Sequence, residues 1–321
     1  MSERRNVPTD RLRYGVVGAG RVFQRFHLPA VTGHPDYALV AICDADPAQA
    51  RATVGDAGRD AVFTDSLTEF FASGRLDVVA VCTPNDSHVA PVLAALAAGA
   101  AVLCEKPLAA GLPDAERIAA AAGTSVLGVN LPYRFHPLLP AFREEIGGPP
   151  DRVTLTFTTA GQRLWRPVTK WYGDPARAGG GALLDLGPHA LDLLTALFGT
   201  PEVVGCRLDG EPVEERVDAE VRFGRTLAHL VVDRAARTMG LTVEAEAGGR
   251  TVTLDLRRNE VRAGADVVAR SDGAGVERAA IDRFLDAVAG RGGEVVGVAE
   301  AVALQRLIEQ MYGSAKGVEA P

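Results

Sequence analysis

The stretch Leu12-Arg13-Tyr14-Gly15-Val16-Val17-Gly18-Ala19-Gly20-Arg21-Val22-Phe23 decides the fold of the N-terminal half. Its first six residues predict a buried strand, and the Gly-Ala-Gly turn leads into a helix that extends to about Val31. Gly18 permits a tight turn, and Gly20 lets a ligand approach the backbone. Phe23 stands where a dinucleotide-binding fingerprint has its third glycine, so the motif is weak alone. A plain glycine turn in another βα unit is the alternative.

Strands and helices alternate from this turn to about residue 122. Residues 12–17, 38–43, 77–82 and 101–104 are predicted strands, and residues 88–98 are predicted to form an apolar helix. Strands separated by helices of this length form right-handed parallel βαβ units with helices on both faces of the sheet. We therefore predict an α/β fold for residues 1–128, a doubly wound Rossmann domain.

The pattern changes after the short apolar segment 126–129. Seven segments are predicted strands, several with period-two alternation: 152–159, 202–208, 219–223, 227–233, 241–245, 251–255 and 260–263. An apolar helix is expected over 181–198, and a helix pair over about 279–288 and 298–312. Residues 129–321 are thus predicted to form an α+β domain for substrate binding and oligomerisation, with a large, mostly antiparallel, open-faced sheet.

Composition excludes several classes of protein. The chain has 321 residues, 34 basic and 41 acidic side chains and a net charge of −7, so a basic nucleic-acid binder is not expected. A chain of this length favours two domains. No apolar run approaches the ~18 residues of a membrane span, and residues 1–13 lack the apolar core of a secretory signal, so we expect a cytoplasmic protein. The four cysteines are far apart without Cys-x-x-Cys spacing, which predicts free thiols and no metal site.

An acidic residue follows the second predicted strand. Asp44 stands 24 positions after Gly20, where a carboxylate can bind the ribose diol of an adenosine and repel a 2′-phosphate. This predicts NAD as cofactor, although Arg21 could offset the charge and NADP stays possible. The alternative role for Asp44 is an N-cap of the helix that starts near Pro47.

The next polar turn is Thr83-Pro84-Asn85-Asp86-Ser87-His88, at the carboxyl end of a buried strand, where open α/β sheets bind ligands. Thr83 and Asn85 can hydrogen-bond a cofactor, and Pro84 fixes the backbone. A capped strand-to-helix turn is the alternative, and both can hold together. We predict that His88 is a structural or cofactor-facing group and not an acid or base.

A lysine follows the fourth strand in Cys104-Glu105-Lys106-Pro107-Leu108. Its position points toward the region where a nicotinamide ring would end. Its ammonium group can polarise a substrate oxygen or lower the pKa of a neighbouring base. The alternative, a solvated surface lysine, is weakened because the chain has only three lysines, the others being Lys170 and Lys316.

A carboxylate and an imidazole follow the triple glycine 179–181. Asp185 and His189 stand four apart, which on a helix places both on one face. A neutral imidazole beside a carboxylate is a suitable general base for a hydroxyl proton. Pro188 is expected to kink the helix or mark its true start. Taken alone, the histidine of such a pair is more often a buried structural residue than a catalytic one.

Together these motifs resemble the Gfo/Idh/MocA family of nicotinamide-dependent oxidoreductases over nearly the whole chain. The resemblance rests on the glycine turn with His27-Leu28-Pro29-Ala30 behind it, on Thr83-Pro84-Asn85, Glu105-Lys106-Pro107 and Tyr133-Arg134-Phe135-His136, and on the Asp-x-Gly-x-His segment. It implies Lys106, Asp185 and His189 as the catalytic set, and a homodimer or homotetramer formed through the free face of the C-terminal sheet. The expected cofactor-binding residues are Gly18, Gly20, Arg21, Val22, Asp44, Thr83, Pro84, Asn85, His88, Glu105 and Lys106.

The activity expected from this resemblance is hydride transfer between NAD(P) and a secondary alcohol or ketone of a sugar, inositol-like polyol or sugar derivative. Arg134, Trp171 and Tyr172 are weaker candidates for substrate binding. A domain-interface salt bridge is the alternative for Arg134, and hydrophobic cover of the sheet is the alternative for the aromatic residues, Trp165 included.

Three other activities stay open. The protein could retain a tightly bound NAD and oxidise only transiently, during glycoside cleavage, epimerisation or intramolecular redox exchange. It could be a nucleotide-sugar ketoreductase, although similar enzymes often carry Tyr at the position of His189. It could also be a non-catalytic, cofactor-sensing regulatory protein, which would need neither Lys106 nor His189.

Overall fold

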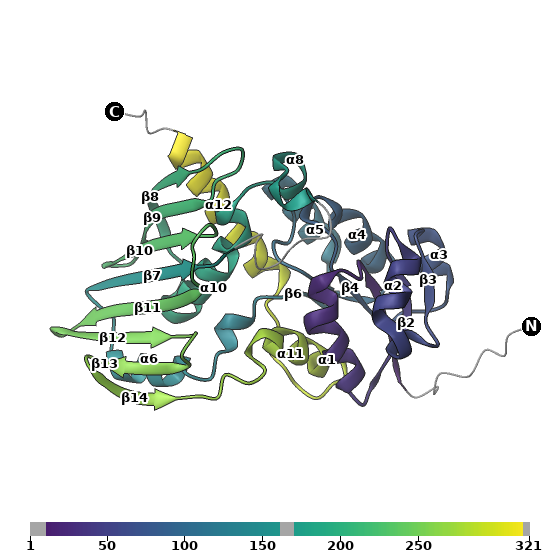
Figure 1. The fold of residues 1–321 in the computed structure, drawn as a ribbon, viewed down its shortest axis with the longest axis horizontal. Helices are drawn as coiled ribbons and strands as arrows, with labels where there is room; N and C mark the ends of the chain where they lie inside the picture. Colours follow the sequence, from purple (N-terminus) through teal and green to yellow (C-terminus); the bar gives the residue numbers. More distant parts are fainter. Residues whose placement is uncertain (1–10, 161–169, 317–321) are drawn as a thin grey trace, which may run out of the picture. The chain divides into compact units, whose positions relative to one another are not determined.

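The computed structural model describes residues 11–160 and 170–316 (Figure 1). These residues form two compact units. The first contains the chain up to Asn130 together with Ala280–Val302, and the second contains Leu131–Ala279 and the chain from Ala303 onward. In the described residues, no helix is both long enough and apolar enough to cross a membrane.

The first unit is built on a parallel sheet of six strands in the order β3-β2-β1-β4-β5-β6. The order reverses direction between β1 and β4, which confirms the predicted doubly wound arrangement. The three-residue strands β3 and β6 lack a predicted counterpart. The strands are β1 (Leu12–Val17), β2 (Tyr37–Cys43), β3 (Val62–Thr64), β4 (Val78–Val81), β5 (Ala101–Cys104) and β6 (Leu127–Val129).

Helices separate these strands, and β4 is buried along its whole length, as expected for a strand covered on both faces. The helical segments of this unit are η1 (Phe23–His27), α1 (Leu28–Gly33), α2 (Pro47–Val54), η2 (Gly55–Gly58), α3 (Leu67–Ala72), η3 (Asn85–Ser87), α4 (Val89–Ala97), α5 (Leu112–Ala122) and α11 (Ala279–Val288).

Helix α11 belongs to the core of the first unit, although the predicted boundary at residues 128/129 leaves it in the second domain. Its residues Ile281, Phe284 and Leu285 join the buried cluster that surrounds β1 and β2. The hydroxyl of Tyr37 donates a hydrogen bond of 2.7 Å to the carbonyl of Leu285. The amphipathic face of α11 was visible in the sequence, but strands β1 and β2, which it packs against, lie more than 230 positions earlier (279 − 43 = 236).

The second unit is built on an eight-stranded sheet in the order β14-β13-β12-β11-β7-β10-β9-β8. Its neighbouring pairs are antiparallel except β7 and β10, which run parallel, so the predicted mostly antiparallel sheet is confirmed. The strands are β7 (Arg152–Thr158), β8 (Glu202–Asp209), β9 (Arg216–Phe223), β10 (Thr226–Asp233), β11 (Gly240–Ala247), β12 (Arg250–Asp255), β13 (Glu260–Ala263) and β14 (Asp266–Arg270). Strand β14 was not predicted, because its charged ends obscure a short valine pair.

One face of this sheet carries the core. Along β7 the side chains of Val153, Leu155 and Phe157 are buried, and the alternate threonines are half-buried. Period-two alternation therefore separates a face covered by helices from an open, polar face. The helical segments of this unit are η4 (Pro132–Phe135), α6 (Leu139–Ile146), η5 (Lys170–Gly173), α8 (Pro175–Ala178), α9 (Ala182–Asp185), α10 (Gly187–Phe198), η6 (Val276–Arg278) and most of α12 (Val298–Lys316).

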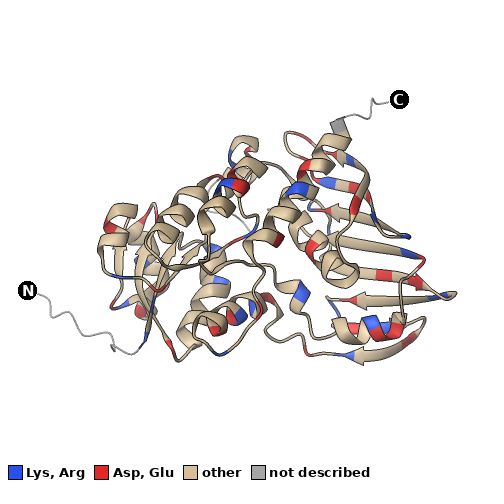
Figure 2. Cartoon of the chain, turned by 180° about the vertical axis from the view of Figure 1, so that it is seen from behind, with Lys and Arg blue, Asp and Glu red and all other residues tan. Residues whose placement is uncertain are grey.

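Charged residues of both signs lie along the strands of the eight-stranded sheet (Figure 2). Asp218 of β9 accepts a hydrogen bond of 2.9 Å from His229 of β10. Its Oδ2 lies 3.8 Å from Nη2 of Arg207 and 3.9 Å from Nη2 of Arg216. These residues alternate with the buried ones, so they belong to the open face.

Candidate functional site

The glycine turn after β1 has one glycine required by the fold and one that leaves space. Gly18 has φ +92°, and a Cβ there would lie 2.7 Å from the carbonyl group of Cys82. Gly20 is exposed, and a Cβ there would meet nothing within 4 Å. The backbone at Gly20 is thus open to the close approach that a pyrophosphate needs.

Phe23 replaces the third glycine of the fingerprint, and the helix after the turn begins with a π-helical segment, η1. The side chains of Phe23 and His27 are both fully buried. Segments of π-helix are rare and often lie at functional sites. Here the segment accommodates a phenylalanine where closer packing would require glycine, and its last residue is a buried histidine.

Asp44 stabilises the glycine turn. Its Oδ2 accepts a hydrogen bond of 2.7 Å from the backbone N–H of Ala19, and its Oδ1 accepts one of 3.0 Å from Asp46. The N-cap of α2 is Asp46, which accepts a hydrogen bond of 2.9 Å from Gln49, so the capping alternative for Asp44 is wrong. A carboxylate has about four acceptor positions. Asp44 can therefore hold the turn and still accept hydrogen bonds from a ribose diol.

The turn after β4 is joined to the turn after β5 by a histidine. His88 is fully buried, with Nε2 3.0 Å from the carbonyl oxygen of Thr83 and Nδ1 2.9 Å from that of Pro107. Burial lowers the pKa of His88 and outweighs the hydrogen bonds that raise it. The hydroxyl of Thr83 donates to the carbonyl of Ser87 at 3.1 Å, and Asn85 is buried. His88 thus connects two loops, in line with the structural role predicted for it.

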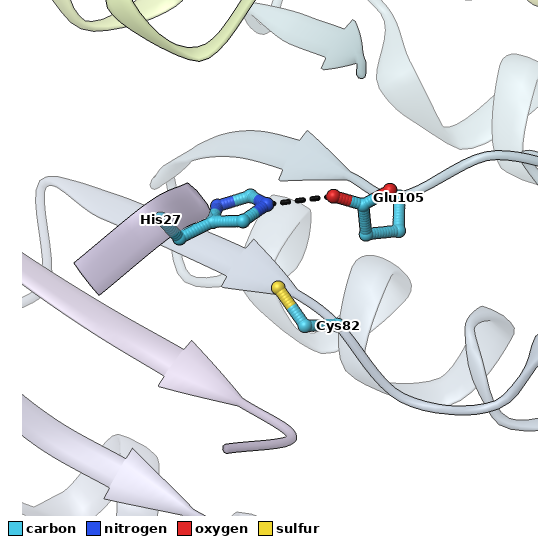
Figure 3. Close-up of side chains that lie close together, drawn as sticks. All are labelled: His27, Cys82 and Glu105. Carbon is cyan, nitrogen blue, oxygen red and sulfur yellow. Dashed lines mark hydrogen bonds and ion pairs between the residues drawn. The ribbon is translucent and has the colours of Figure 1, made fainter. Parts of the chain in front are cut away.

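Glu105, directly after β5, is the centre of a buried polar cluster (Figure 3). Its Oε1 lies 2.7 Å from Nε2 of His27 and 2.8 Å from Nδ2 of Asn130. Nδ1 of His27 lies 3.2 Å from the hydroxyl of Tyr14. Burial alone would raise the pKa of Glu105. The contacts with His27 and Asn130 and the charge of Lys106 lower it by more than burial raises it, so the pKa lies below its ordinary value. The cluster therefore holds a carboxylate ion.

His27, Cys82 and Glu105 also form a set of potential metal ligands, with their ligand atoms within 4.8 Å of one another (Figure 3). The His27–Glu105 contact of 2.7 Å has the length of a charge-assisted hydrogen bond, which favours hydrogen bonding over metal binding.

The composition of this cluster was not predicted. The sequence singled out His27 only as part of the motif behind the glycine turn, and it indicated no role for Asn130. The available signal was position: Asn130 directly follows β6, and Glu105 directly follows the neighbouring β5. Lys106 comes next in the chain and is half-buried, with a cis peptide bond to Pro107.

In the second unit, the triple glycine has a packing role. A Cβ at Gly181 would collide with the carbonyl oxygen of Glu214, and one at Gly180 with the hydroxyl of Tyr312. The buried carboxylate of Glu214 accepts hydrogen bonds from the N–H groups of Gly181 at 2.8 Å and Leu183 at 3.1 Å, and from the Tyr312 hydroxyl at 2.7 Å. These contacts fix the start of α9, which ends at Asp185.

The helix predicted over 181–198 is two helices, α9 and α10, interrupted at Leu186. The interruption follows from Pro188, which lies in the first turn of α10 and cannot donate a backbone hydrogen bond. The proline therefore marks a true helix start, as one of the two expectations had it. Asp185 ends the first helix, and His189 lies in the first turn of the second.

Aromatic residues surround these two side chains. The ring of His189 lies edge-on to Tyr133 at 5.2 Å and to Phe157 at 6.4 Å between centroids. The hydroxyl of Tyr172 donates a hydrogen bond to Oδ2 of Asp185. Packing thus restricts the imidazole, and a phenol orients the carboxylate.

The three weaker candidates have partners within the second unit. Arg134 donates from Nε to both carboxylate oxygens of Asp192, at 3.0 and 3.1 Å. Arg134 and Asp192 both belong to the second unit, so this ion pair is not a salt bridge between the two units. Tyr172 packs edge-on against Trp171 at 5.5 Å, and the guanidinium of Arg234 lies 5.1 Å from the centre of its ring. Trp165 lies outside the described residues.

Comparisons with known proteins bear on the family and the fold of this chain. A profile described as "Oxidoreductase family, NAD-binding Rossmann fold" matches residues 12–129, and one described as "GFO/IDH/MocA C-terminal domain" matches residues 142–251. The D-glucoside 3-dehydrogenase of Escherichia coli strain K12 is 33% identical over 200 residues, which are 61% of this chain and 57% of that protein. The inositol 2-dehydrogenase of Rhizobium meliloti strain 1021 is 33% identical over 198 residues, which are 60% of this chain and 56% of that protein. The match thus spans little more than half the length of these relatives.

Among solved structures, GenD2 from gentamicin A biosynthesis, in complex with NAD, superimposes with a TM-score of 0.81 at 26% identity. The similarity covers 100% of this chain and 99% of that protein, so it extends over both units.

Proposed function

Because this chain belongs to the Gfo/Idh/MocA family and carries an NAD-binding Rossmann domain, we propose that it is an oxidoreductase. It transfers a hydride between NAD and a secondary alcohol or ketone of a sugar, an inositol-like polyol or a sugar derivative. Two features of the chain together support the proposal. The nucleotide turn is open at Gly20, and the second unit holds Asp185 and His189 among aromatic side chains.

The proposed reaction balances as follows. The substrate carbon loses a hydride and its hydroxyl loses a proton, so the alcohol becomes a ketone as NAD⁺ becomes NADH. NAD supplies the hydride acceptor. His189 takes the hydroxyl proton as general base, with Asp185 as its partner, and Lys106 stabilises the developing alkoxide. These three roles are carried over from the family resemblance, and the Tyr172 contact supports an oriented carboxylate at Asp185.

Asp44 supports NAD over NADP as the preferred cofactor. Its carboxylate accepts hydrogen bonds from the N–H groups of Ala19 and Asp46, and a carboxylate at this strand end of a Rossmann domain binds the ribose diol and repels a 2′-phosphate. Substrates of the sugar and polyol class are supported by the glucoside and inositol dehydrogenases to which the chain is similar.

Assembly and location are further parts of the proposal. The open, polar face of the eight-stranded sheet, with its Asp218 and His229 pair, supports a homodimer or homotetramer formed through that sheet. A cytoplasmic location stays a prediction from the sequence.

The test is an assay of the purified protein against a panel of glucosides, inositols and anhydro-sugars with NAD and NADP, followed by absorbance at 340 nm. NADH formation with at least one member supports the proposal. Turnover without added nucleotide, by protein that purifies with nicotinamide absorbance, would instead indicate a retained cofactor. Nucleotide binding without turnover of any compound would indicate the regulatory role and contradict an oxidoreductase.

A further inference from the structure

The buried cluster around Glu105 lies at the edge of the sheet where ligands of this fold bind. Glu105 directly follows β5 and Asn130 directly follows β6, and these neighbouring strands are parallel, with Cys104 opposite Val129. The backbone N–H of Glu105 bonds to Val81 at 2.9 Å, and that of Asn130 bonds to Cys104 at 3.0 Å. Both side chains are thus held by the sheet itself at its carboxyl end, where open α/β folds bind their cofactors.

The hydrogen bonds of the cluster fix which groups are donors. Glu105 is ionised and can only accept, so Nε2 of His27 and Nδ2 of Asn130 must donate to it. Nδ1 of His27 lies 3.2 Å from the hydroxyl of Tyr14, which can donate a hydrogen bond to it. Both ring nitrogens of His27 then have hydrogen-bond partners. The negative charge of Glu105 is therefore shared through hydrogen bonds, and no cation is required inside the cluster.

One atom beside the carboxylate has no partner. Asn130 is 5% exposed, and its Oδ1 is buried without a hydrogen bond in the described structure. The amide cannot be turned to relieve this, because its oxygen would then face the carboxylate of Glu105. Buried acceptors without a donor are rare in folded proteins and need an explanation. A ligand that donates a hydrogen bond to Oδ1 of Asn130 would explain it.

A fixed anion and an unpaired acceptor side by side suit a ligand that is cationic and carries an N–H group. The oxidised nicotinamide has both properties: its ring is a cation, and its carboxamide has an N–H₂ group. The reduced ring is neutral and keeps the carboxamide. We propose that Glu105 and Asn130 form an acceptor site for the nicotinamide, in which the charge of Glu105 makes the protein bind NAD⁺ in preference to NADH.

This inference rests on the proposed use of NAD, and it adds a preferred direction of the redox reaction. A protein that stabilises NAD⁺ relative to NADH favours release of the reduced cofactor, which suits oxidation of the alcohol. The charge of Lys106, next in the chain, acts in the opposite sense on the ring. The negative charge of Glu105 then offsets, at the ring, the positive charge of Lys106, which stabilises the alkoxide.

The test is the ratio of the dissociation constants of NAD⁺ and NADH, measured by calorimetry at pH 8 and low salt without substrate. Glu105→Gln keeps the shape and an acceptor oxygen but removes the charge. It should weaken NAD⁺ binding relative to NADH about tenfold or more, since unit charges a few ångströms apart interact strongly in a protein interior. Lys106→Gln should shift the ratio in the opposite direction. Asn130→Leu should weaken both forms by a similar factor, because both carry the carboxamide.

The matched control is Asp77→Asn. Asp77 is a part-buried carboxylate of the same unit, at the amino end of β4, where it accepts a hydrogen bond of 2.8 Å from the N–H of Arg13. Its replacement should leave the ratio within about twofold of the wild type. The proposal is overturned if folded Glu105→Gln keeps the wild-type ratio, or if Asp77→Asn shifts it equally. Should Glu105→Gln fail to fold, an unchanged ratio in Lys106→Gln overturns the proposal.

These outcomes are separate from those of the activity assay. The ratio is measured without substrate, so a protein that turned over no panel compound could still show the expected shifts. Conversely, an active enzyme with an unchanged ratio would retain the proposed function and lose this inference.

Discussion

Arg134 and Asp192 form a buried ion pair in the second unit. The Asp192 side chain is 1% exposed and that of Arg134 is 10% exposed, and Asp192 lies on α10 three residues after His189. Asp192→Asn keeps the shape but leaves the guanidinium without its charge partner. Breaking a buried pair in this way costs about 3–5 kcal/mol, because the remaining charge stays desolvated.

Replacing both partners should cost far less than replacing one. In the double variant Arg134→Met/Asp192→Leu, no charge is left buried, and apolar side chains fill similar space, so we expect a loss of about 1–2 kcal/mol. The assay is urea unfolding monitored by circular dichroism, in which Asp192→Asn should lower the midpoint by about 1–3 M. Asp56→Asn is the control, because its pair with Arg59 is exposed and should contribute less than about 1 kcal/mol.

Additive effects would contradict this role of the ion pair. If Arg134→Met and Asp192→Leu each cost little alone and the double variant costs their sum, the pair does not stabilise the protein through charge. The placement of Arg134 would then need another explanation, and its earlier interpretation as a substrate contact would regain support.

Three further predictions concern the site. Lys106→Arg should lose most of kcat while the Kd for NAD changes little, because a planar guanidinium cannot replace a compact ammonium group; steady-state kinetics and calorimetry check this. Tyr172→Phe removes the hydrogen bond to Asp185 and should lower kcat about tenfold, with a changed pH profile and an unchanged Kd for NAD. The pKa of His88 is lowered in the folded state, so its contribution to stability is present above the unfolded pKa of about 6.5 and lost as the pH falls below it. Urea midpoints between pH 8 and 5 should show this slope, and His88→Asn should reduce it; a slope of opposite sign would mean that the folded protein holds an imidazolium.

Much of the fold could be predicted because local patterns and tertiary packing agree. The glycine at position 18 is required by its positive φ and by the Cys82 carbonyl beside it, and the apolar run of β4 is buried throughout. Strands β3, β6 and β14 were missed because three to five residues carry too little periodicity. The position of α11 depends on a sheet far away in the sequence, which no local pattern reports.

The site was harder to predict for the same reason. Asp185 and His189 could be named from spacing, but the hydrogen bond from Tyr172 connects η5 to α9 through tertiary structure. His27 has an ordinary sequence context, and only the π-helical segment η1 and the depth of burial show that it faces Glu105. Buried polar networks of this kind follow from packing and not from periodicity.

We propose that the chain oxidises a sugar or polyol alcohol with NAD, using His189 as the base and Lys106 as the cation. Transfer of deuterium from a substrate labelled at the reacting carbon to C4 of the nicotinamide, followed by mass spectrometry of the recovered cofactor, tests this reaction. The wild type should give labelled NADH, and the label should fall at least a hundredfold in His189→Asn and Lys106→Met, each tested for NAD binding. Reduced cofactor without label, or undiminished transfer in both variants, would exclude the proposed reaction.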